Sequence, residues 1–225
     1  ANVSHELRTP LSILRGYIET LLDSPKTPHE ELIRILCIMQ RHSDRLELLV
    51  EDLLTLAQLE STNPNLQMGT VDLSSFLPEM LRDWEKKLKS KQLNIILDVP
   101  PELSPICVDR VRLQEALYNL LDNAVKYSRE RGEIRLSIQQ HDKEIELIVS
   151  DKGIGIAKED LPRIFERFYR ADKARSSDKI RGTGLGLAIV KHIAQLHGGR
   201  VEADSELGNG TTIRMILPSI DPPGS

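Results

Sequence analysis

The chain begins with a histidine next to a carboxylate, in the segment Ser4–Pro10. If this segment is helical, His5 and Thr9 lie one turn apart on the same face, with Glu6 beside them. Pro10 has no backbone N–H, so the helix should bend there. A nucleophilic nitrogen next to a base could carry out group transfer. A lone His-Glu pair is more often an ordinary surface pair, so the rest of the chain must decide.

A second polar cluster lies at Asn119–Tyr127. On a helix, Asn119 and Asn123 are one turn apart, and Lys126 lies on the same side. Amide oxygens are hard, neutral ligands that suit a Mg²⁺ ion already carrying phosphate oxygens. A lysine ammonium adds a point charge for phosphate. Taken one at a time, these residues would more often be explained by capping or surface hydrogen bonding.

Two glycine-rich segments follow the asparagine cluster. Asp151–Gly155 comes directly after a predicted strand, where glycines let the backbone approach a flat ligand and the carboxylate can accept from an amine such as that of adenine. A common Asp-x-Gly turn is the alternative. Gly182, Gly184 and Gly186 lie at the start of a predicted helix, whose N-terminus is an anion site. The spacing is neither that of a P-loop nor that of a dinucleotide fingerprint. The polar run 171–181 between the two segments has the composition of a lid.

The elements that must position the first cluster form a helical hairpin. Apolar residues at spacings of three and four predict a helix to Leu22 and a second one to about Glu60, with Thr27 as the N-cap of the second. One pairing cannot cover both apolar stripes, so residues 1–62 are expected to dimerise into a four-helix bundle with His5 outside. The alternative is a hairpin that packs on its own C-terminal domain.

A polar linker at residues 63–67 reads as a hinge before a domain at 68–220, with a flexible tail at 221–225. Hairpin patterns and intervening helices predict an α+β class, a sheet with helices on one face. The expected strands are 71–73, 94–99, 133–140, 143–150, 200–205 and 211–217, and the expected helices are 74–90, 108–127 and 185–197.

Composition limits the classes of function. The formal net charge of −4 over 225 residues gives no electrostatic reason to expect nucleic acid or contact with an anionic membrane. Cys37 and Cys107 are too far apart in sequence for a C-x-x-C site, which fits a reducing compartment. The chain starts without Met inside a helical pattern, so it is interpreted as a fragment of a longer protein.

Five segments, in this order, resemble the boxes of two-component sensor histidine kinases. They are the H box at Ser4–Pro10, the N box at Asn119–Tyr127, the G1 box at Asp151–Gly155, the F box at Phe165–Phe168 and the G2 box at Gly182–Leu187. Any one box is weak evidence, but five in order over nearly the whole chain are specific. The opening segment is most similar to the phosphate-regulon sensor kinases.

The resemblance implies a dimerisation and phosphotransfer hairpin followed by a Bergerat-type α/β sandwich that binds ATP. His5 would accept the phosphoryl group, Glu6 would take its proton, and Thr9 would orient water for the reverse dephosphorylation of a response regulator. Asn123 would be the Mg²⁺ ligand. The other implied ATP-binding residues are Asn119, Lys126, Tyr127, Asp151, Gly153, Gly155, Arg170, Gly182, Gly184 and Gly186.

The resemblance also implies partners and a location. The partners would be a second copy of the chain and the receiver domain of a response regulator, which takes the phosphoryl group on an aspartate. The fragment would be cytoplasmic, from a membrane-anchored parent. Two alternatives stay open: a nucleotide-binding dimeric scaffold with little kinase activity, and a kinase of the same ATPase superfamily that modifies serine. Whether a chain phosphorylates itself or its dimer partner also stays open.

Overall fold

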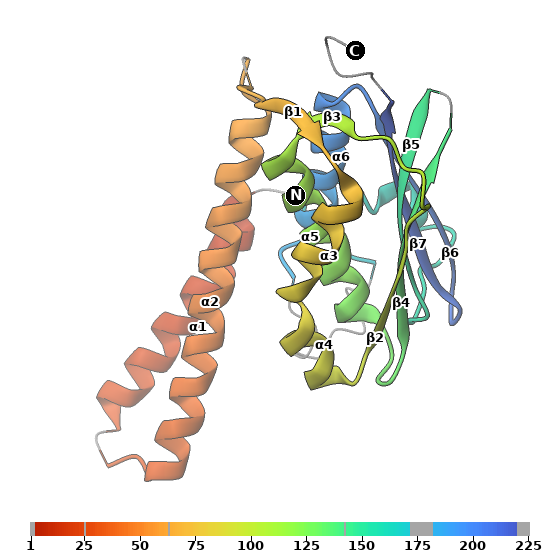
Figure 1. The fold of residues 1–225 in the computed structure, drawn as a ribbon. Coiled ribbons are helices and arrows are strands. Elements are labelled where there is room, and N and C mark those ends of the chain that lie inside the picture. The colour runs from red at the N-terminus through yellow and green to blue at the C-terminus, as the bar shows by residue number, and fades with distance from the viewer. Residues whose placement is uncertain (1–2, 25, 63, 142, 172–181, 220–225) are drawn as a thin grey trace.

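The structure, a computed structural model, describes residues 3–24, 26–62, 64–141, 143–171 and 182–219. It has a helical hairpin, α1 (Val3–Asp23) and α2 (His29–Leu59), followed by an α/β domain (Figure 1). The hairpin and the α+β class predicted from the sequence are confirmed. The expected lid lies outside the described residues apart from Ala171, and the expected tail lies wholly outside them.

The hairpin differs from expectation at the start of α2. Thr27 does not cap that helix, because its hydroxyl donates instead to the carbonyl of Ser24, at 2.6 Å. Pro28 occupies the N-cap position and has no side chain that could cap. In α1, Pro10 lies inside a helix that continues beyond it, and the Thr9 hydroxyl donates to the carbonyl of His5 at 3.1 Å.

The apolar stripe of the hairpin is only partly covered. Leu49, Leu56 and Leu59 of α2 belong to the same buried core as the α/β domain. The expected alternative, packing of the hairpin on its own C-terminal domain, therefore holds for one side of α2. Other large apolar side chains of the hairpin stay exposed, namely Val3, Leu11, Ile18, Leu22, Ile33, Leu36, Leu48, Val50 and Leu54.

The main sheet has five strands in the order β2-β4-β5-β7-β6. Only β2–β4 is a parallel pair, and the other three pairs are antiparallel. The strands are β2 (Asn94–Asp98), β4 (Glu133–Gln140), β5 (Glu144–Asp151), β6 (Arg200–Glu206) and β7 (Gly210–Pro218). A separate pair joins β1 (Met68–Val71) to β3 (Ile106–Asp109).

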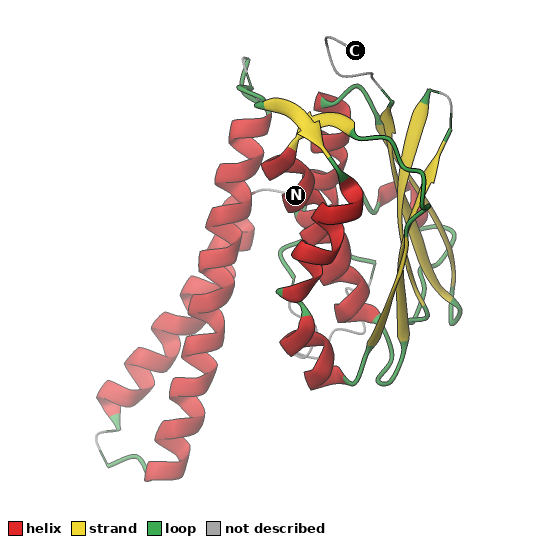
Figure 2. Ribbon diagram, in the orientation of Figure 1, coloured by secondary structure: helices red, strands yellow, loops and turns green. Residues whose placement is uncertain are grey.

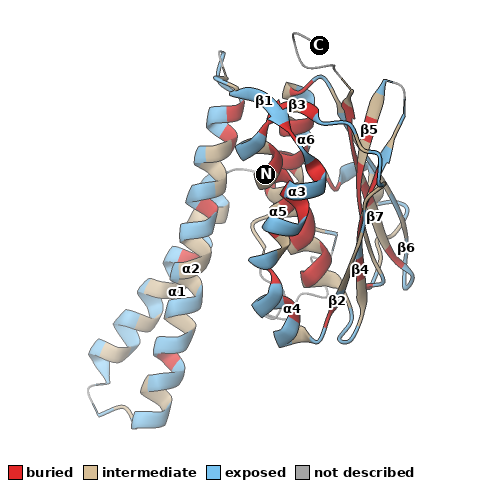
Figure 3. Cartoon of the chain, in the orientation of Figure 1, coloured by how far each residue is buried: buried red, intermediate tan, exposed pale blue. Residues whose placement is uncertain are grey.

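The main helices of the domain cover one face of the sheet and lie between it and α2 (Figures 1 and 2). They are α3 (Leu73–Arg82), α4 (Glu85–Lys91), α5 (Arg110–Tyr127) and α6 (Gly186–Leu196), and a 3₁₀ turn, η1, spans Leu161–Arg163. Buried residues concentrate on α5, α6 and the strand face that meets them (Figure 3). The core thus fixes α5 and α6, the two helices that carry the asparagine and glycine clusters.

Three expected boundaries in this domain are wrong. The first strand ends at Val71, and Asp72 caps α3 by accepting from the backbone N–H of Ser74 at 3.0 Å. The single helix expected over 74–90 is two helices, separated at Asp83 and Trp84. Residues 106–109, expected to be partly helical, form β3.

Asp109 joins the start of α5 to its surroundings. Its buried carboxylate accepts from the N–H groups of Val111 and Arg112 at 3.0 and 3.1 Å, and from that of Gln67 at 2.8 Å. Its own N–H donates to Nε2 of buried His197 at 3.0 Å, and Nδ1 of His197 lies 2.8 Å from the carbonyl of Ile193. The N-terminal end of α5 is therefore attached to the C-terminal end of α6.

Candidate functional site

One cavity of about 1110 Å³ collects the predicted nucleotide residues. Its walls come from α4, α5, the loop after β5, the start of α6 and one side of α2. Ten of the eleven residues expected to bind ATP line it: Asn119, Asn123, Lys126, Tyr127, Asp151, Gly155, Arg170, Gly182, Gly184 and Gly186. The eleventh, Gly153, is buried and does not reach the cavity wall.

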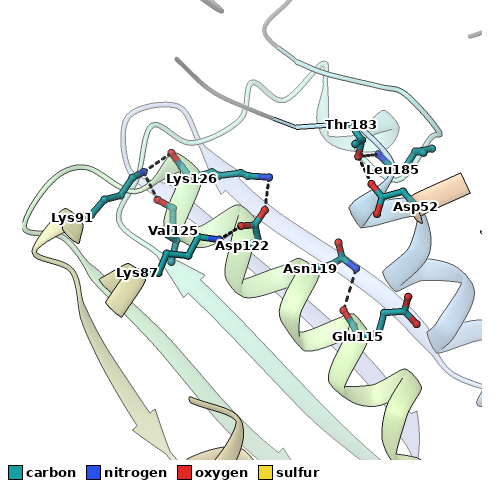
Figure 4. Close-up of polar contacts among 10 residues, drawn as sticks. All are labelled: Asp52, Lys87, Lys91, Glu115, Asn119, Asp122, Val125, Lys126, Thr183 and Leu185. Atoms are coloured by element: carbon teal, nitrogen blue, oxygen red, sulfur yellow. Dashed lines mark hydrogen bonds and ion pairs between the residues drawn. The ribbon is translucent and has the colours of Figure 1, made fainter. Parts of the chain in front are cut away.

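The α5 wall carries both amides and a paired lysine. Nδ2 of Asn119 donates to the carbonyl of Glu115 at 3.1 Å (Figure 4). Lys126 pairs with Asp122, one turn earlier, and Lys87 of α4 pairs with the same carboxylate. Burial alone would raise the pKa of Asp122, but the two ammonium groups outweigh it and hold the pKa below its ordinary value.

Asp151, the last residue of β5, holds the loop that follows it. Its carboxylate accepts from the N–H of Gly153 at 2.8 Å. Burial raises the pKa of Asp151 to about 6, although the backbone N–H groups of Gly153 and Thr211 favour the charged form. A Cβ on Gly153 would lie 2.3 Å from the Tyr127 carbonyl, so glycine lets the end of α5 and this loop meet. A carboxyl group therefore lies in the cavity wall, next to a loop whose backbone contacts Tyr127.

The glycines at the start of α6 have separate roles. Gly184 has φ of +76°, and its carbonyl accepts from the N–H of Phe168 at 2.8 Å. A Cβ on Gly186 would lie 2.6 Å from Oδ1 of Asn119, so the amide oxygen faces the first turn of α6. Gly182 faces open space. These contacts put a helix N-terminus, which attracts anions, opposite the asparagine face of α5.

The cluster around His5 lies apart from this cavity. His5 is exposed and lines neither it nor the small neighbouring pocket of about 190 Å³. Glu6 and Thr9 line the small pocket, together with Pro10, Ile13, His42 and Arg45. The residues around His5 thus form a local group on the hairpin, and the structure places His5 outside the cavity.

The sequence did not indicate the contacts that join the hairpin to the domain. The hydroxyl of Thr183 donates to Asp52 of α2 at 2.5 Å (Figure 4). Asn119 of α5 lines the same cavity as these two residues. Burial raises the pKa of Asp52. Near the end of α2, Glu60 pairs with Arg167 and lies 3.0 Å from Nε2 of His192. The sequence around a charged residue on a helix does not reveal such contacts, because the partners are more than 100 positions away.

Two family models match the chain. Residues 1–62 match the His Kinase A (phospho-acceptor) domain. Residues 108–220 match the histidine kinase-, DNA gyrase B-, and HSP90-like ATPase. The chain belongs to the sensor histidine kinases. This confirms the family expected from the five boxes, and most residues that line the cavity lie in the part of the chain that matches the ATPase model.

Relatives of this histidine kinase match over nearly its whole length. It is 39% identical to sensor histidine kinase WalK of Bacillus subtilis over 97% of the chain, which is 36% of WalK. It is 41% identical to the phosphate regulon sensor protein PhoR of Pseudomonas aeruginosa over 94% of the chain, 47% of PhoR. The likeness to phosphate-regulon sensors is consistent with the second match. The chain spans less than half the length of these relatives.

A solved structure has the same arrangement. The structure of full-length ShkA in complex with AMPPNP is 30% identical, with a TM-score of 0.72, and covers 97% of this chain and 45% of that one. In the part of the histidine kinase that the structure describes, no helix has both the length and the apolar character needed to cross a membrane.

Proposed function

We propose that this chain binds ATP with Mg²⁺, transfers the γ-phosphoryl group to His5, and passes it to an aspartate of a response-regulator receiver domain. One observation carries the proposal: ten residues expected to bind ATP line a single cavity, on a chain whose hairpin exposes a histidine next to a carboxylate. AMPPNP, an ATP analogue, is named in the similar ShkA structure.

Different residues of the cavity bind different parts of the nucleotide. Asp151 accepts from the adenine amino group, and Tyr127 lies against the ring. Lys126, Arg170 and the first turn of α6 bind the phosphates. The donor set fits a metal, because the Asn123 amide lines the cavity and the Asn119 oxygen faces Gly186. Bound there, Mg²⁺ would neutralise charge on the phosphate oxygens.

The chemistry at the hairpin follows from His5 and Glu6. A neutral imidazole nitrogen attacks the γ-phosphorus, the bond to the β-phosphate oxygen breaks, and ADP leaves. Glu6 accepts the imidazole proton. The product is a phosphoramidate, from which an aspartate of the receiver domain takes the phosphoryl group.

Transfer requires the domain to change its position on the hairpin, because His5 lies outside the nucleotide cavity. We place the hinge at residues 63–67, between a phosphotransfer unit at 1–62 and a catalytic unit at 68–220. The hinge ends where Gln67 is bound to Asp109, at 2.8 Å. The contacts of Asp52 and Glu60 with the domain would break and reform around it.

The exposed stripe of the hairpin supports a homodimer. Nine large apolar side chains of α1 and α2 are exposed in the single chain. Leu48 lines the nucleotide cavity, and a second hairpin would cover the others in a four-helix bundle. Sedimentation of the purified chain at micromolar concentration tests this. A dimer is expected, and a monomer would contradict the assembly while leaving the chemistry of the site unaffected.

The kinase is tested with γ-labelled ATP and Mg²⁺, wild type beside His5→Gln, with each sample split between acid and base. Phosphohistidine is lost in acid and kept in base, so acid-labile label that is absent from the variant is the expected result. Acid-stable label would instead indicate serine modification. No label despite tight ATP binding would favour a regulatory scaffold.

Thr9→Ala separates the two expected activities. Thr9 lies one turn from His5 and lines the pocket of Glu6, where it can orient water toward a regulator's phosphoaspartate. The variant should label His5 at the wild-type rate but dephosphorylate the regulator more slowly. Thr9→Ser, which keeps the hydroxyl, is the control and should retain both activities. Equal phosphatase rates in wild type and Thr9→Ala would refute the assignment.

A further inference from the structure

Arg45 of α2 is the residue that links the two sites. It lines the nucleotide cavity and also the small pocket beside Glu6 and Thr9. Its Nη2 lies 3.9 Å from Oε2 of Glu6, and the two side chains are 36% and 37% exposed. A guanidinium therefore lies between the place where ATP is expected and the carboxylate expected to act as base.

The contact between Arg45 and Glu6 is easily exchanged. Its length is at the limit of an ion pair, and solvent screens both partners, so it contributes little to stability. A phosphoryl group presents two or more charged oxygens that match the planar fork of a guanidinium. A phosphate entering this region should therefore replace the carboxylate as the partner of Arg45.

Several ammonium groups of the cavity are occupied by protein acceptors. Lys87 and Lys126 share the carboxylate of Asp122 (Figure 4). Lys91 donates to the carbonyls of Val125 and Lys126, at 2.7 and 3.3 Å. These three lysines belong to the α4–α5 side, whereas Arg45 belongs to the hairpin side that carries the acceptor.

We propose that Arg45 is a catalytic residue of the phosphoryl transfer to His5, a role that rests on the function proposed above. Arg45 leaves Glu6 and binds the γ-phosphoryl oxygens as the bond from phosphorus to the β-phosphate oxygen breaks and the bond to the His5 nitrogen forms. ADP leaves with the bonding pair. Glu6, released from Arg45, accepts the imidazole proton. A single change of partner by Arg45 thus orients the phosphoryl group and leaves Glu6 able to accept a proton.

The test compares Arg45→Gln and Arg45→Lys with Arg41→Gln. Arg41 is exposed one turn earlier on α2, where it donates to the carbonyl of Cys37 at 3.3 Å and lines neither pocket. Three quantities are measured: AMPPNP affinity, the rate of His5 labelling at saturating ATP, and the reverse transfer from phosphorylated His5 to ADP.

Arg45→Gln should slow both directions of transfer roughly tenfold or more, because both share one transition state, and change AMPPNP affinity much less. Arg45→Lys should recover part of the rate, and Arg41→Gln should behave as wild type. Wild-type rates in Arg45→Gln would overturn the proposal, as would equal slowing by Gln and Lys. Failure of the wild type to label His5 would instead refute the proposed function.

Discussion

At the scale of single residues, we expect Asp151 to make nucleotide binding depend on pH. Burial raises the pKa of its carboxyl to about 6. The adenine amino group donates a hydrogen bond, so the ionised carboxylate is the better acceptor. We expect AMPPNP affinity to fall roughly tenfold between pH 7 and pH 5, where only about a tenth of the carboxyl groups is ionised. Calorimetric titration at pH 5, 6 and 7 measures this.

Asp151→Asn is the control for that measurement. The variant cannot ionise at this position, so its affinity should be weak and nearly constant over the same range. A slope as steep as in the wild type would show that another group causes the dependence.

Without nucleotide, the same carboxyl affects stability in the opposite direction. Its pKa in the folded chain lies above the ordinary value, so the folded state binds the proton more tightly than the unfolded state. Its contribution to the free energy of unfolding is fully present below about pH 4 and is lost as pH rises to about 6. In denaturant titrations over this pH range, the wild type should therefore lose free energy of unfolding as pH rises, relative to Asp151→Asn.

Two glycines of the cavity should respond differently to alanine. At Gly155, φ is +68° and a Cβ would lie 2.0 Å from the backbone carbonyl of Glu206. The left-handed conformation alone costs about 1–2 kcal/mol, so Gly155→Ala should lower the free energy of unfolding by at least that amount. At Gly186 the nearest atom is Oδ1 of Asn119, the end of a side chain that can move.

Gly186→Ala should therefore weaken AMPPNP binding in Mg²⁺ with little change in stability. Urea unfolding and nucleotide titration of both variants give the comparison. The interpretation of Gly186 fails if its variant loses stability as much as Gly155→Ala does, or if it binds AMPPNP as tightly as the wild type.

At the scale of elements, α5 depends on its cap. The buried Asp109 carboxylate accepts from three backbone N–H groups, two at the start of α5 and one from Gln67. Loss of an ordinary N-cap costs about 1 kcal/mol, and here buried donors would also lose their acceptor. Asp109→Ala should lower the free energy of unfolding by about 2–3 kcal/mol, as urea titration would show.

Asp72→Ala is the matched comparison, because Asp72 caps α3 by accepting from Ser74 at an exposed position. It should cost about 1 kcal/mol or less. Equal losses in the two variants would mean that burial and the Gln67 contact add nothing at Asp109.

Elements with a long local pattern were predictable. The apolar period of α1, α2 and α5 and the alternation in β4 and β5 are visible in the sequence, and ten of the eleven residues expected to bind ATP line one cavity. The four-residue β3 was not predictable, because it pairs with β1 some forty residues earlier and runs directly into the cap of α5. The break at Asp83 and Trp84 interrupts a helical pattern that has no glycine or proline at that point.

Contacts between distant segments were not predictable either. Asp52 on α2 and Glu60 at its C-cap lie among other charged residues, and their partners are set by how the domain lies on the hairpin. The partner of Arg45 is set by the pairing of α1 with α2. Local sequence specifies a residue's helix and its face, but it does not specify the partner across an interface.

At the scale of the whole molecule, we expect transfer within one chain. The cavity wall includes α2 of the same chain, and Arg45 on that wall contacts Glu6 of the same chain. We therefore expect a mixed dimer of His5→Gln and Asn123→Ala chains to remain unlabelled, since neither chain has both an acceptor and a complete nucleotide site. Differently tagged chains, purified together and incubated with γ-labelled ATP, give the measurement.

The control is a mixed dimer of wild type with His5→Gln, in which the wild-type chain should be labelled. Label on the Asn123→Ala chain of the test dimer would show that ATP bound to one chain reaches the histidine of the other.

The attachment of α6 to α5 through His197 fixes the width of the phosphate site. The N–H of Asp109 donates to this buried side chain, whose other ring nitrogen lies 2.8 Å from the carbonyl of Ile193. At the start of α6, the opposite end of that helix, Gly186 faces Asn119 in the middle of α5. The distance between α5 and α6 beside the proposed phosphate site is therefore set inside the domain, although one side of α2 also lines the cavity. We expect a nucleotide with a shorter or longer phosphate chain to fit this fixed distance less well.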